Sequence, residues 1–145
     1  MKLVLDSSVL AKLFIEESGT EDALALIGLA HMLDLELLAA QLAVSEVGNV
    51  LWKHLRDTDD DGSEHMRQLF LLDITFVPLD SVRSSRASSL ATGHDISFYD
   101  AVHVALAEEH LCDLVTEDNE LQKKVDQAIG LRKARELVES PAFAP

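Results

Sequence analysis

Directly after Met1 the sequence reads Lys2-Leu3-Val4-Leu5-Asp6-Ser7-Ser8, an apolar run that ends at an acid and two hydroxyl residues. The apolar run is typical of a short buried strand, and an Asp followed by serines has the chemistry of a helix N-cap. A strand that passes directly into a helix is the first half of a β-α-β unit. The stretch predicts an α/β fold and places the carboxylate of Asp6 at the carboxyl end of the first strand.

The rest of the sequence repeats this alternation of strand and helix. Short apolar runs predict further strands at 36–39, 74–77 and 114–116. Apolar residues at helical spacing, with capping residues before them, predict helices at about 9–14, 18–31, 42–56, 63–72, 80–93, 97–111 and 121–129. Strands joined by crossover helices predict a three-layer α/β domain with a central parallel sheet of four to five strands. The tail, 130–145, is compatible with helix or strand.

Length and composition indicate one ordinary globular domain over residues 1–145. Hydrophobic residues make up 48% and charged residues 26% of the chain, and no repeat or linker divides it. The longest apolar stretch, 37–45, is too short for a bilayer, and no secretory signal pattern opens the chain. The single Cys112 cannot form an internal disulfide and is expected to be a small buried hydrophobe. We expect a cytoplasmic protein without membrane attachment.

The net charge of −14 restricts the choice of partner. Proteins that bind nucleic acid through bulk electrostatics are basic, because phosphate contacts dominate the affinity. Here 26 acids oppose 12 bases, and neutralising four of the carboxylates would still leave −10. Composition alone therefore disfavours a nucleic-acid partner, unless metal ions and a local basic patch provide the attraction.

Four acids are expected to meet at one rim of the sheet. Asp6 and Asp118 follow predicted strands, whereas Glu46 and Asp100 lie in the first turns of predicted helices, each within an apolar stretch. Ligands of open α/β sheets bind outside the carboxyl ends of the strands, where these positions converge. Carboxylates are rarely buried unless they are paired or bound to a metal, and four together would repel one another. Oxygen ligands of this kind suit Mg²⁺ or Mn²⁺.

Four motifs carry a resemblance to a known family. They are Lys2-Leu3-Val4-Leu5-Asp6-Ser7-Ser8, Ser45-Glu46-Val47-Gly48-Asn49-Val50-Leu51, Ser97-Phe98-Tyr99-Asp100-Ala101-Val102-His103-Val104-Ala105-Leu106-Ala107 and Leu114-Val115-Thr116-Glu117-Asp118. In order and spacing, over about residues 1–125, they resemble the PIN-domain family, and most of all its VapC-type toxin ribonucleases. The resemblance implies that the catalytic, metal-holding acids are Asp6, Glu46, Asp100 and Asp118. It also implies that Ser8 and Thr116 orient them by hydrogen bonds.

The resemblance implies a function as well. We expect an endoribonuclease that depends on Mg²⁺ or Mn²⁺, prefers single-stranded RNA, forms a homodimer and is silenced by an antitoxin protein. Two alternatives stay open: a PIN-type nuclease of RNA processing without an antitoxin, and a non-catalytic PIN-like scaffold. A receiver domain would need a second acidic pair and a lysine after the last strand, and neither is found. A phosphatase with a D-x-D motif is excluded because Ser8 replaces its second Asp.

Three further features of the sequence could bind a ligand: a pair of arginines, a histidine and an acidic loop. Arg83 and Arg86 are three residues apart, share one helix face, and are candidates for contacting RNA, or acidic groups of an antitoxin. His103 follows Asp100 by one turn and could be a ligand, but an oxygen site for Mg²⁺ does not need imidazole, so we expect it to pack on the helix. Residues 57–62 match half of an EF-hand loop, and without a Glu at the twelfth position we expect an acidic surface loop.

Overall fold

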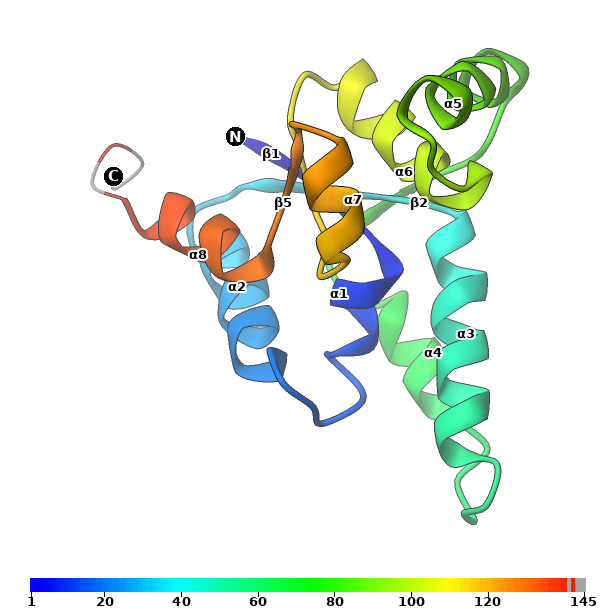
Figure 1. Ribbon diagram of the computed structural model, residues 1–145. Helices are drawn as coiled ribbons and strands as arrows, with labels where there is room; N and C mark the ends of the chain where they lie inside the picture. Colours follow the sequence, from blue (N-terminus) through cyan, green and yellow to red (C-terminus); the bar gives the residue numbers. More distant parts are fainter. Residues whose placement is uncertain (141, 143–145) are drawn as a thin grey trace.

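Five parallel strands form the sheet at the centre of the computed structural model, which describes residues 1–140 and 142. The strands are β1 (Lys2–Leu5), β2 (Glu36–Ala40), β3 (Thr75–Val77), β4 (Asp113–Val115) and β5 (Ala128–Ile129). Their order across the sheet is β3-β2-β1-β4-β5, so the first strand of the chain occupies the middle (Figure 1). All four pairings are parallel, which confirms the predicted parallel sheet of four to five strands.

Eight helices in the described residues connect and cover the strands. They are α1 (Ser7–Ala11), α2 (Thr20–Met32), α3 (Leu42–Leu55), α4 (Ser63–Leu69), α5 (Ser81–His94), α6 (Phe98–Glu109), α7 (Asn119–Lys124) and α8 (Leu131–Glu139). Two predicted N-caps are present: the carboxylate of Asp80 accepts from Arg83 N at 2.8 Å, and the hydroxyl of Ser97 accepts from Asp100 N at 3.1 Å. Within the described residues, no helix combines the length and the apolar character that a membrane crossing requires.

The two faces of the sheet bury separate apolar clusters. Successive side chains of a strand point to opposite faces, so Leu3 and Leu5 pack on one side and Val4 on the other. Helices α1, α2, α3, α4 and α8 contribute to the Leu3 cluster, and helices α5, α6 and α7 contribute to the Val4 cluster. This arrangement is the predicted three-layer architecture.

The predicted helix over 121–129 is wrong in its second half. Helix α7 ends at Lys124, Val125 takes extended dihedral angles, and β5 then pairs with β4. Apolar residues four apart fit one helix, but they also fit a short helix followed by a strand. Residues 128 and 129 form a strand because they pair with β4, whose backbone groups at this edge then have hydrogen-bond partners. One of these bonds runs from Thr116 N to Ile129 O at 2.9 Å.

Two predicted helix ends also differ from the structure. Helix α2 does not begin at residue 18, whose sequence Ser18-Gly19-Thr20-Glu21 has the form of a capping box. Its N-cap is Gly19, which takes the left-handed conformation with φ 90° that glycine adopts without strain. Helix α5 runs past Gly93 to His94, and Asp95 takes the left-handed position with φ 53°. Aspartate is among the few other residues that tolerate it.

The tail of the chain is helical as far as it is described. Helix α8 runs beside α2, to which it is tied by Arg135 Nη1 at 2.8 Å from Asp22 Oδ1 (Figure 1). Residues 141 and 143–145 lie outside the description. Residues 57–62 form the expected acidic surface loop, in which the carboxylate of Asp60 accepts from Gly62 N at 2.8 Å.

Candidate active site

Asp6 lies at the carboxyl end of the central strand and is only 6% exposed. It caps α1, and its Oδ1 accepts from Ser8 N at 3.0 Å, from Val9 N at 3.3 Å and from the Ser8 hydroxyl. Burial raises the pKa of Asp6, while the neighbouring His103 and the hydrogen bonds from Ser8 and Thr116 act in the opposite direction. One carboxylate oxygen is thus fixed by several donors in a dry environment.

Two hydroxyl groups join the segment after β1 to the segment after β4. The Ser8 hydroxyl, which donates to Asp6, also accepts from Glu117 N at 3.0 Å. The hydroxyl of the fully buried Thr116 accepts from Asp118 N at 3.1 Å and lowers the pKa of Asp6. Because β1 and β4 are parallel neighbours, these hydroxyls lie where both strands end. They contact the acids that the sequence assigned them to orient.

Asp118 is the N-cap of α7 and lies at the exposed side of the site. Its Oδ1 accepts from Glu120 N at 2.9 Å and from Leu121 N at 3.0 Å. The helical turn therefore holds one oxygen of Asp118, as α1 holds one oxygen of Asp6. Both acids are positioned by backbone N–H groups in the first turn of a short helix, which also favour the ionised carboxylate.

Asp100 lies in the first turn of α6, within electrostatic reach of two other acids. Burial is the main reason that its pKa is raised; the Ser97 hydrogen bond lowers it, and the charges of Asp118 and Glu46 raise it further. These charges act across helices α3, α6 and α7, whose residues are far apart in sequence. The structure therefore brings Glu46, Asp100 and Asp118 together.

Glu46 has a buried partner, which the sequence did not identify. Its Oε1 lies 2.7 Å from Nε2 of His103, whose side chain is 2% exposed. The imidazole also lowers the pKa values of Asp6 and Asp100, so it lies among three of the four acids. His103 packs on its helix as expected, but it does so as a hydrogen-bonding member of the site. Its spacing of three residues from Asp100, on the same helix face, was the available signal.

The charge and chemistry of these side chains fit a divalent cation that retains water. Among residues 1–140 and 142, no three Asp, Glu, His or Cys side chains are close enough together to hold an ion between them. Mg²⁺ does not require such a cage, because it is commonly bound through one or two carboxylates and keeps several waters. Burial, and after it the charges of Asp118 and Glu46, raise the pKa of Asp100, and a cation beside this carboxyl would favour its ionised form. The acids are thus suited to Mg²⁺ or Mn²⁺ bound mainly through water.

Arg83 and Arg86 are not brought to the acids. Arg83 binds Glu109 through two hydrogen bonds of 2.6 and 2.9 Å, and Arg86 binds Glu108 through two of 3.0 and 2.7 Å. These glutamates end α6, about 12 Å along the helix axis from Asp100 in its first turn. Contact of the two arginines with RNA stays a prediction, and each guanidinium would have to exchange a carboxylate for a phosphate.

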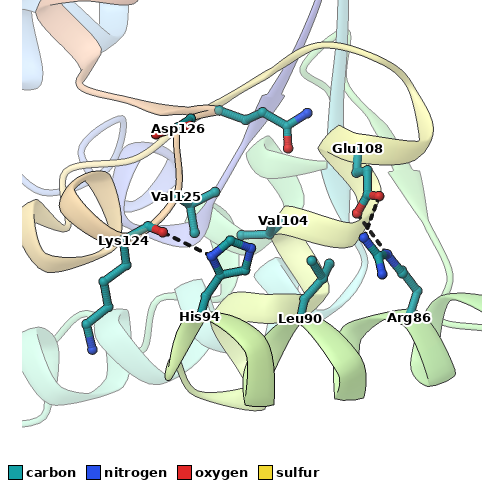
Figure 2. Close-up of a pocket in the computed structure, with 9 residues that line it drawn as sticks. Arg86, Leu90, His94, Val104, Glu108, Lys124, Val125 and Asp126 are labelled. Carbon is teal, nitrogen blue, oxygen red and sulfur yellow. Dashed lines mark hydrogen bonds and ion pairs between the residues drawn. The ribbon is translucent and has the colours of Figure 1, made fainter.

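The pocket beside Arg86 is separate from the four acids, none of which lines it (Figure 2). Figure 2 shows the Arg86–Glu108 pair at one end of this pocket and His94 at the other. His94 Nδ1 lies 3.0 Å from the backbone oxygen of Lys124. Because acidic side chains, Glu108 and Asp126, line it together with Arg86 and Lys124, this pocket does not provide the basic patch that RNA phosphates would need.

Comparison with known proteins agrees with this geometry. The PIN domain family model matches residues 3–127. Ribonuclease VapC3 of Pyrobaculum aerophilum is 36% identical over 132 residues, which cover 86% of this chain and 95% of that protein. The fold resembles the crystal structure of PAE2754 from Pyrobaculum aerophilum, with a TM-score of 0.71, 24% identity and 95% coverage of both chains.

A toxin–antitoxin complex from Klebsiella pneumoniae has a chain of the same fold. The TM-score is 0.65 at 17% identity, with 89% of this chain and 97% of that chain covered. At such identities the two structural matches show the fold alone. The family match extends over most of the residues that form the sheet and includes all four acids, and the chain therefore belongs to the PIN-domain family.

Proposed function

We propose that this protein is an endoribonuclease that hydrolyses RNA phosphodiester bonds with the help of Mg²⁺ or Mn²⁺. The observation that carries the proposal is the position of Asp100, where burial first of all, and then the charges of Asp118 and Glu46, oppose ionisation of the carboxyl. Such clustering of like charge disfavours the folded chain by itself, and a divalent cation would reverse it. The relationship to Ribonuclease VapC3 supports RNA as the substrate.

The assigned roles follow from the hydrogen bonds. When bound, the ion would supply an acidified water as nucleophile and offset the charge that develops on the phosphate. Asp6 and Asp118 each have one oxygen fixed by backbone N–H groups, so their second oxygens are available to the ion or its waters. Glu46 is oriented by His103, and the hydroxyls of Ser8 and Thr116 fix the segments that carry Asp6 and Asp118.

Cleavage of a closed RNA circle is the direct test. We expect the purified protein to linearise circular single-stranded RNA with Mg²⁺ or Mn²⁺ and to stop when EDTA is in excess. A circle has no ends, so its loss identifies an endonuclease. Asp113→Asn is the matched control, because Asp113 lies at the start of β4, at the other end of the strand from Asp118. Cleavage that persists in EDTA, or that is lost equally in Asp113→Asn, would contradict the proposal.

We further propose that an antitoxin protein silences this nuclease, and that it acts in the cytoplasm as one half of a toxin–antitoxin pair. The shared fold with a chain of a toxin–antitoxin complex supports this partner. The product of any short gene adjacent to this one should co-purify with the protein and suppress RNA cleavage. A nuclease of RNA processing would instead remain active in the presence of that product.

A homodimer is the assembly that we propose for the free protein. Large apolar side chains remain exposed on several elements, among them Trp52 on α3 (58%), Val82 on α5 (76%) and Leu111 after α6 (90%). Such side chains are commonly covered when subunits associate. Light scattering at micromolar concentration should give about twice the chain mass of 15.9 kDa. A mass equal to that of a single chain would contradict the dimer.

A further inference from the structure

Two aromatic residues open α6 directly before the Asp100 carboxylate. Phe98 is 41% exposed and Tyr99 is 62% exposed. The backbone here is fixed, because the Ser97 hydroxyl accepts from Asp100 N and begins the helix at this point. Tyr99 lies directly before Asp100 in the chain, and on the same face of α6 as His103, four residues on, which contacts Glu46. An aromatic side chain is thus presented to solvent beside the place where we expect the phosphate to be cleaved.

Tyr99 differs from Trp52 and Phe70, the other aromatic residues that are more than half exposed, because those two have partners within the chain. The Trp52 ring lies 5.9 Å from the guanidinium carbon of Arg56, and the Phe70 ring lies 5.4 Å from that of Phe76. In the part of the chain that the structure describes, no aromatic ring or cation stacks on Tyr99. Its flat face is available to a partner from outside.

The charge of the protein makes such a face useful for binding RNA. At a net charge of −14, the protein as a whole repels the phosphates of RNA. The arginines of α5 are already paired with glutamates of α6. Stacking of a nucleobase on an aromatic ring does not depend on charge, and in single-stranded RNA the bases are free to do so.

We propose that Tyr99 stacks on a nucleobase of single-stranded RNA, next to the phosphate that lies at the acids. This inference rests on the proposed ribonuclease function and adds to it the way in which the substrate is held. It explains how a strongly acidic protein would bind RNA near its acids. Stacking on a base contributes affinity that offsets the repulsion between the phosphates and the protein's negative charge. Because every base has an aromatic face, the contact selects unpaired RNA without selecting a sequence.

The first experiment measures the affinity for a labelled single-stranded RNA by fluorescence anisotropy in EDTA, so that cleavage is suppressed. We expect Tyr99→Ala to weaken binding by roughly 5- to 150-fold, the range that corresponds to one stacked base, and Tyr99→Phe to stay within about twofold. The ratio between Tyr99→Ala and the unmodified protein should be the same at low and high salt, because no phosphate contact is lost. Trp52→Phe, which alters an exposed aromatic about 9 Å further along α3 than Glu46, is the matched control.

The second experiment observes the ring itself. The chain has one Trp and one Tyr, so Tyr99 is the remaining strong emitter in Trp52→Phe. Its fluorescence should be quenched as single-stranded RNA is added. RNAs with one abasic nucleotide, moved along the strand, should bind more weakly at one position beside the cleavage site, and this effect should disappear in Tyr99→Ala.

Three outcomes of these experiments would overturn the proposed stacking contact. If the protein cleaves RNA but Tyr99→Ala binds it as tightly as the unmodified chain, the stacking contact is absent and the nuclease function stands. If the protein neither binds nor cleaves RNA, both proposals fail. If Tyr99→Ala weakens an antitoxin complex and leaves the RNA affinity unchanged, the ring belongs to a protein interface instead.

Discussion

His103 Nε2 lies 2.7 Å from Glu46 Oε1 and joins α6 to α3, although 57 positions separate the two residues. An ionised carboxylate can only accept a hydrogen bond, so the imidazole donates from Nε2. Nδ1 of this buried ring has no hydrogen-bond partner within the described part of the chain. Among the described residues, the one hydrogen bond of this ring is therefore the bond that orients an acid of the site.

Removal of this hydrogen bond should reduce RNA cleavage. We expect His103→Ala to lower the cleavage rate by roughly 10- to 100-fold, the range seen when a group that orients a metal ligand is lost. His103→Gln keeps an N–H donor and should recover part of the rate. Thermal unfolding of both variants separates loss of orientation from loss of folding. Equal rates in the alanine and unmodified proteins would show that Glu46 needs no positioning.

Asp100→Asn should abolish cleavage and leave the metal-free protein folded and slightly more stable. The substitution keeps the side-chain volume but removes a partly buried charge that Asp118 and Glu46 disfavour. RNA cleavage and the melting temperature in EDTA measure the two effects. A folded Asp100→Asn protein with normal activity would remove this residue from the site.

The metal-free protein should become less stable as the pH rises, because the carboxyl pKa values of Asp6 and Asp100 are raised in the folded state. Burial, above all, raises the pKa of Asp6 and of Asp100 in the folded state above the value of 3.8 expected in the unfolded chain. The folded state then binds more protons than the unfolded state, so these groups reduce the free energy of unfolding as pH rises from about 3.8 through the folded pKa. The difference in melting temperature between the unmodified protein and Asp100→Asn, followed over pH, isolates the contribution of Asp100. An absence of pH dependence in that difference would contradict this assignment.

Added Mg²⁺ or Mn²⁺ should stabilise the protein more at neutral than at acidic pH. The ion binds the ionised carboxylates, and binding to the folded state alone raises the melting temperature. We expect the increase to become smaller as the pH approaches the carboxyl pKa values and to be reduced in Asp100→Asn. An equal increase at every pH would indicate that the ion binds elsewhere.

The ion pairs between α5 and α6 permit a test of the predicted RNA contacts of Arg83 and Arg86. If these arginines bind phosphates, Arg83→Ala with Arg86→Ala weakens RNA binding and flattens its dependence on salt. Glu108→Gln with Glu109→Gln removes the negative charge that each guanidinium meets on α6, although Arg83 keeps its pair with Asp80 at 2.9 Å. The double variant should then strengthen binding and steepen that dependence. RNA affinity measured against salt for both double variants gives the answer. No change in either would exclude the two arginines as phosphate contacts.

Several features of this protein are determined by residues close together in the sequence. The first four strands, the N-caps at Asp80 and Ser97, and the positions of Asp6 and Asp118 after strands all depend on local patterns. An apolar run followed by a polar capping residue determines its backbone conformation within about one turn of helix. Parallel strands then carry Asp6 and Asp118 to the same edge of the sheet. With the resemblance of the four motifs to the PIN-domain family, the sequence was sufficient to name the four acids as one candidate site.

Other features depend on residues that only the tertiary structure brings together. Residues 128 and 129 form a strand because β4 offers them an unpaired edge, although their spacing from Leu121 suits a helix equally well. The bond from His103 to Glu46 and the ion pairs of Arg83 and Arg86 join residues 22 to 57 positions apart. A side chain's hydrogen-bond partner depends on which helices pack together, and the local pattern of residues contains no information on that choice.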